Sequence, residues 1–72
     1  MGNDERIKLT TLLNYWIEHN REHGQEFREW AEKAEGLGET EVAKEIQEAV
    51  KEMDKASELL SQALSRLKGR EG

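Results

Sequence analysis

The sequence predicts an all-α fold, an antiparallel two-helix hairpin that is expected to dimerise into a four-helix bundle. In two long stretches, apolar residues recur at alternating steps of four and three, the heptad spacing of packed helices. A Gly-Leu-Gly tripeptide separates these stretches, and no segment has the strict alternation of a β-strand. The chain has 72 residues and no Pro, which favours a single domain of long helices.

The first helix is predicted over about residues 5–35. Its apolar stripe is interrupted by two polar residues and consists of Leu9, Leu13, Trp16, Asn20, His23, Phe27, Trp30 and Ala34. Trp16 and Trp30 are fourteen residues apart and share a face, so we expect both indoles to pack in the core. An aromatic cage for a ligand is the alternative role for the pair.

A turn is predicted over residues 36–38. Gly36 follows the last periodic residue, where a left-handed glycine commonly closes a helix. Leu37 would then fold back onto the last turn. Gly38 starts the next helix, whose first turn holds Glu39 and Glu41, and acidic side chains suit the positive end of a helix dipole.

The second helix is predicted over about residues 39–68, followed by a frayed tail over 69–72. Its stripe is apolar throughout and consists of Val42, Ile46, Ala49, Met53, Ala56, Leu60, Ala63 and Leu67. A short connection makes the two helices antiparallel neighbours. Further apolar residues widen the first stripe at Leu12, Ile17 and Ala31 and the second at Ala43, Val50 and Leu64. Both stripes are therefore wider than the two positions per heptad that a two-stranded contact covers, which predicts a homodimer.

The polar interruption of the first stripe is a candidate metal site. His19 and His23 lie four residues apart on one helix face, so both imidazoles can reach one ion. Glu22 and Glu26 each lie three residues beyond a histidine, and either could supply an oxygen ligand. Imidazole with carboxylate suits zinc, copper, nickel or iron(II) and does not select among them.

Other roles for the same residues compete with metal binding. A bare H-x-x-x-H pair is common in helices, and Asn20 follows His19 where a zinc protease would carry its catalytic Glu. Asn20 at a seam position can fix register and oligomeric state. His23 can be a buried imidazole bonded to Asn20 or to a second chain. Protonation of histidine beside carboxylates could also make the interface sensitive to pH.

Composition argues against several functional classes. The net charge of −5 disfavours nucleic acid as a partner. The absence of Cys excludes disulfides and thiol catalysis, and no apolar run is long enough to span a membrane. The N-terminal residues lack the order of a signal peptide, so a cytoplasmic location is expected.

No nucleophile–base pair is recognisable, because the second helix carries serines and no His. We therefore predict a non-enzymatic interaction module, with a transition-metal-binding hairpin as the alternative.

The segment Trp16-Ile17-Glu18-His19-Asn20-Arg21-Glu22-His23 resembles a small group of prokaryotic helical-hairpin domains. That group carries a W-I-E-H-N-x-x-H core and a second helix rich in Glu and Ala, and the resemblance covers nearly the whole chain. Several members have His where this chain has Tyr15, a departure that removes one possible metal ligand. The resemblance implies a hairpin fold and no established activity.

A designed origin is a separate hypothesis. The absence of Cys and Pro, and the second helix rich in Glu, Lys and Ala, are features that a designer would choose. Asn20, His23 and Gly24 within one helix are features that a designer would usually avoid.

Overall fold

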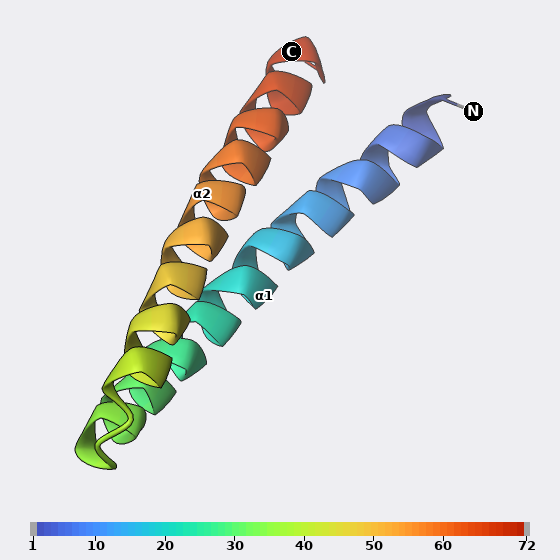
Figure 1. Ribbon diagram of the computed structural model, residues 1–72. Coiled ribbons are helices and arrows are strands. Elements are labelled where there is room, and N and C mark those ends of the chain that lie inside the picture. Colours follow the sequence, from blue (N-terminus) through green and yellow to red (C-terminus); the bar gives the residue numbers. More distant parts are fainter. Residues whose placement is uncertain (1, 72) are drawn as a thin grey trace.

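The computed structural model describes residues 2–71 and confirms an all-α hairpin (Figure 1). Helix α1 spans Gly2–Gly36 and helix α2 spans Thr40–Glu71, and the two run antiparallel. Both helices exceed the predicted ranges. α1 begins three residues earlier, and α2 continues through most of the tail that was expected to fray. Residue 72 of that tail lies outside the described residues.

The turn closes α1 with Gly38, not with Gly36 as the sequence had suggested. Gly38 has a φ of +84°, whereas Gly36 is the last helical residue. The Glu39 amide donates to the carbonyl of Ala34 at 2.9 Å, and the Gly38 amide donates to that of Glu35 at 3.0 Å. This pair of bonds is the Schellman arrangement, which places its left-handed residue one position beyond the helix cap. Gly36 therefore needs no special conformation.

The contact between the helices is built on small side chains. The buried residues of the seam are Leu13, Gly24, Ala31, Ala34, Ala43 and Val50. Ten further residues are half-buried, and most of them lie toward the open end of the hairpin: Thr10, Ile17, Asn20, His23, Ile46, Met53, Ser57, Leu60, Leu64 and Leu67. In α1 the seam keeps the predicted stripe positions 13, 20, 23 and 34 and the widening positions 17 and 31, and it adds 10 and 24. The predicted positions 9, 16, 27 and 30 are exposed. Alanine allows the backbones to approach closely where an indole would hold them apart.

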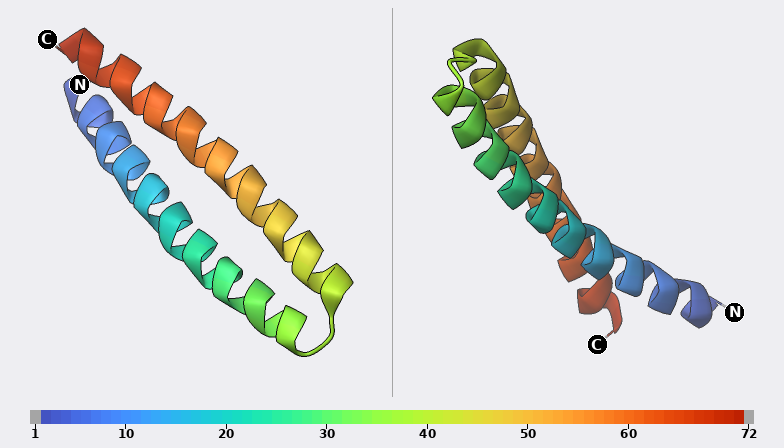
Figure 2. Two further views of the ribbon diagram at one scale, coloured as in Figure 1. Left: turned by 90° about the vertical axis from the view of Figure 1, so that its left-hand side faces the viewer. Right: turned by 90° about the horizontal axis from the view of Figure 1, so that it is seen from below.

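The hairpin is long and thin, with extents of 54 × 15 × 14 Å. The helices lie close together near the turn and separate toward the two termini (Figure 1 and the right view of Figure 2). Burial follows this shape, because the buried alanines lie near the turn. Within residues 2–71, neither helix contains a stretch apolar enough to cross a membrane.

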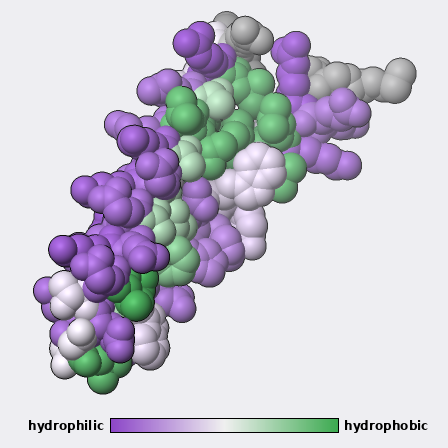
Figure 3. All heavy atoms as spheres, in the orientation of Figure 1, coloured by the Kyte–Doolittle hydropathy of each residue, from purple (hydrophilic) through white to green (hydrophobic). Residues whose placement is uncertain are grey.

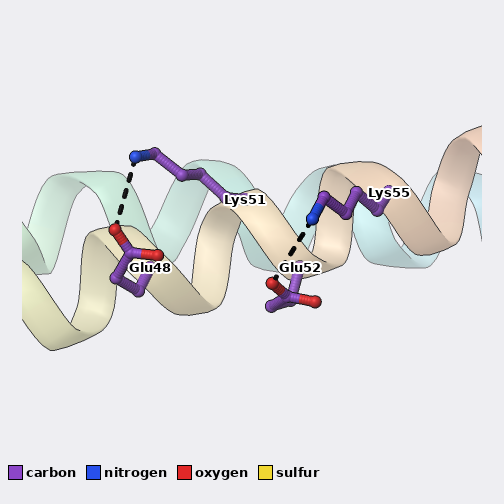
Figure 4. A network of polar contacts seen from close by, with 4 residues as sticks. All are labelled: Glu48, Lys51, Glu52 and Lys55. Carbon is purple, nitrogen blue, oxygen red and sulfur yellow. Dashed lines mark hydrogen bonds and ion pairs between the residues drawn. The ribbon is translucent and has the colours of Figure 1, made fainter.

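The outer surface of α2 is charged. Lys51 binds Glu48 at 3.3 Å and Lys55 approaches Glu52 at 3.8 Å, one helical turn apart in each case (Figure 4). These side chains are exposed, so each pair contributes a few tenths of a kcal/mol. Elsewhere apolar atoms gather in a strip between the helices, bordered by hydrophilic side chains (Figure 3). The hairpin is therefore amphipathic as a whole.

Candidate functional site

The two histidines of α1 contact each other. The Nε2 atoms of His19 and His23 are 2.9 Å apart, a hydrogen bond in which one ring donates to the lone pair of the other. The four-residue spacing puts both side chains on the same helix face. His19 is exposed and His23 is half-buried. Two imidazole nitrogens therefore converge on one point at the edge of the seam.

Aromatic neighbours hold this pair on both sides. Tyr15 stacks on His19 with ring centroids 5.2 Å apart, and Phe27 lies 6.2 Å from His23. The two imidazoles meet edge to face at 4.4 Å. The four rings form a column along α1 at intervals of one helical turn. Contacts on both sides restrict the rotamers of the imidazoles, so the pair is preorganised before any ligand arrives.

The carboxylates predicted as further ligands do not complete a metal site within one chain. Among the residues that the structure describes, no group of three or more His, Asp or Glu side chains is placed to hold a metal ion. Glu22 is exposed, and Glu26 lines an apolar depression beside Phe27 and Trp30. A single hairpin therefore presents two nitrogen ligands, which is half of a structural zinc set.

The aromatic residues predicted for the core lie at its margin. Trp16 is 40% exposed, Trp30 is 54% exposed and Phe27 is 36% exposed. The Lys33 ammonium lies 4.3 Å from the centre of the Trp30 ring. Within one chain the two tryptophans flank the seam and do not fill it, which corrects the predicted packing. Asn20 keeps its predicted place in the seam, where it is half-buried.

The exposed apolar residues beside the seam form one surface, which we call the open apolar face. Its α1 side is formed by the positions flanking the seam, and Phe27 and Trp30 line a depression of about 290 Å³ with Ile46 and Ala49 of α2. The face comprises Leu9, Trp16, His23, Phe27 and Trp30 of α1 with Ile46 and Ala49 of α2. Its helical spacing was visible in the sequence, but its exposure was not.

The opposite side of the hairpin is polar. A groove of about 690 Å³ is lined by arginines of α1 and by Ser57, Ser61 and Ser65 of α2. Arg28 binds Asp54 there at 3.1 Å, an ion pair between the helices that sequence reasoning missed. Neither histidine lines this groove. The serines therefore have no imidazole beside them to act as a general base.

Comparison with known proteins relates the whole hairpin to one family. The family described as "Domain of unknown function (DUF8180)" matches residues 9–67. A relative from Archaeoglobus fulgidus, described as an uncharacterized protein, is 39% identical over 57 residues. The alignment covers 79% of this chain and 90% of the relative. No solved structure matches the chain significantly. The matched region contains the histidine pair, both tryptophans and the turn.

Proposed function

We propose that this chain, which belongs to the DUF8180 family of domains of unknown function, is a non-enzymatic interaction module that self-associates through its open apolar face. The observation that carries the proposal is the surface left uncovered by one hairpin. Large apolar side chains occupy that face, whereas the opposite groove and the outer side of α2 are polar or charged. A second copy is the partner whose surface has the same chemistry, and two-fold dimers are the commonest assemblies.

The exposed area supports a second copy as the occupant. A compact monomer of this mass, 8.3 kDa, exposes about 4,600 Å² of surface. The hairpin exposes 5886 Å². The excess of about 1,300 Å² is more than the roughly 800 Å² that each partner buries in a standard interface. Association through one face therefore brings the exposed surface into the range of compact proteins.

Sedimentation velocity over a hundredfold range of protein concentration tests the proposal. We expect a dimer mass at micromolar concentration and a thermal midpoint that rises with concentration, because association stabilises the folded chain by mass action. A monomer mass throughout, with a midpoint independent of concentration, would refute self-association.

A second function, transition-metal binding, is favoured by the 2.9 Å separation of the His19 and His23 Nε2 atoms. Imidazole is a ligand for zinc, copper, nickel and iron. Adding zinc to protein freed of metal should then raise the thermal midpoint. The W-I-E-H-N-x-x-H core that contains both histidines remains a predicted signature of the family.

A further inference from the structure

Five side chains form a row on one flank of α1, and the order of their residue types is the same from either end. At seven-residue intervals it consists of Leu9, Trp16, His23, Trp30 and Leu37. His23 is central and half-buried, and the four others are 40% to 78% exposed. Leu37 lies just beyond the end of α1, where its amide still bonds the Lys33 carbonyl at 3.0 Å as in a helix. The row is therefore symmetric about His23.

This symmetry suits two copies of α1 packed antiparallel about a two-fold axis. With the axis beside His23, each Trp16 faces Trp30 of the second copy, and each Leu9 faces Leu37. The tryptophan pairs lie about 10 Å on either side of the axis at 1.5 Å per residue. A slip of one heptad would instead set an imidazole against an indole. Seven-residue spacing also winds such helices into the left-handed supercoil of a bundle.

The same axis sets His23 of the two chains opposite each other and lies one helical turn, about 6 Å along the helix, from each His19. Each pair has its Nε2 atoms 2.9 Å apart, and within one chain no further ligand completes a site among the described residues. Zinc in a structural site takes four ligands, with Zn–N bonds of about 2.0–2.1 Å. Two nitrogens at tetrahedral positions lie roughly 3.4 Å apart, so each pair needs to open by only about half an ångström.

We propose that His19 and His23 of two chains bind one transition-metal ion through four imidazole nitrogens on the two-fold axis of the dimer. The inference rests on the proposed self-association and adds a metal ion bound between the two chains. In this arrangement the aromatic column of Tyr15 and Phe27 orients each pair, and Glu22 and Glu26 are not ligands.

Native mass spectrometry with zinc alone tests the shared site. We expect one zinc per dimer for the wild-type chain. The H19Q/H23Q variant should remain a dimer and bind no zinc at micromolar concentration. Each single variant should lose more than the roughly 10–100-fold in affinity that loss of an outer-shell partner causes. The matched control, E22Q/E26Q, keeps both imidazoles and should keep one zinc per dimer.

The outcomes separate this inference from the proposed function. A dimer that binds no zinc, or one zinc per chain with loss in E22Q/E26Q, overturns the shared site and leaves self-association intact. A chain that is monomeric with and without zinc overturns both. Circular dichroism of each variant checks that it folds, so that loss of zinc is assigned to the ligands.

Cysteine cross-linking tests the register independently, since the native chain has no Cys. We mix Leu9→Cys chains with Leu37→Cys chains and add a short bismaleimide. Mixed cross-links should dominate, because residues 9 and 37 of opposite chains face each other in this register. Two copies of residue 9 would lie roughly 42 Å apart along the direction of the helices. Self-linked Leu9→Cys chains would overturn the register.

Discussion

Gly24 occupies a buried position of the seam, yet a Cβ built on it would meet no atom within 4 Å. A glycine inside a helix costs about 1 kcal/mol relative to alanine. Gly38 is the opposite case, because its φ of +84° is a conformation that L side chains rarely adopt. The conformation of the chain therefore requires glycine at position 38 and does not require it at position 24.

The same substitution at these two glycines should have opposite effects. Gly24→Ala should raise the free energy of unfolding by about 1 kcal/mol, which corresponds to roughly 4–8 °C in Tm for a domain of this size. Gly38→Ala should lower the free energy of unfolding by about 1–2 kcal/mol. Thermal unfolding of both variants at one protein concentration is the measurement. Destabilisation by Gly24→Ala would show that something else fills the gap beside residue 24.

The geometry of the histidine pair is also set by contacts of individual side chains. Its spacing is common in helices, and by itself it indicates little. The Nε2 separation of 2.9 Å and the rings of Tyr15 and Phe27 on either side give it a defined geometry. The metal proposal therefore rests on this arrangement and not on the motif.

At the scale of the helices, one seam of small residues holds α1 against α2. Ala31, Ala34 and Ala43 are buried, while Asn20 is one of the polar members of the seam. Alanines bring the backbones close but remove little apolar area from water. The pairing of the two helices is consequently specific near the turn and weaker toward the termini, where they separate (Figure 1).

Asn20→Leu should raise the free energy of unfolding by about 1 kcal/mol, because an apolar side chain replaces a half-buried amide between apolar neighbours. The distribution of oligomers should broaden, since a polar seam residue fixes register. Chemical denaturation and sedimentation together measure the two effects. A less stable variant would mean that the Asn20 amide forms bonds worth more than the apolar contact.

At the scale of the whole molecule, the hairpin has two unlike faces. The open apolar face carries Trp16 and Trp30, and the other carries the groove of arginines and serines. Tryptophan is enriched among the residues that dominate binding energy at interfaces. Truncating one should therefore affect association more than the fold of a single chain.

Trp30→Ala should raise the dimer dissociation constant by about 30-fold or more, the effect of losing a hot spot of at least 2 kcal/mol. The Tm of the variant should fall below that of the wild-type chain at concentrations where the wild-type chain is dimeric, and the two should converge at low concentration. Ile7→Ala is the control, because Ile7 is 61% exposed and lies about 200° around the helix from Leu9. A Trp30→Ala cost that is independent of concentration would place this indole in the fold and not in the interface.

The two helices, their antiparallel order and the position of the turn were predictable from the sequence, because the heptad spacing and the Gly-Leu-Gly tripeptide are local signals. The tertiary structure decided which of two adjacent stripes on α1 meets α2. The stripe with Trp16 and Trp30 carries the larger apolar side chains, but the one with the small, buried Ala31 lets the backbones approach.

The structure likewise decided that Gly38 is the left-handed residue of the turn, since the two hydrogen bonds that close α1 place that residue two positions beyond the last helical residue, Gly36. Periodicity reports which residues share a side of a helix. It does not report the rotation of that helix against its neighbour, which packing sets through the sizes of facing side chains. That rotation leaves the large aromatic residues and the histidine pair on an uncovered face.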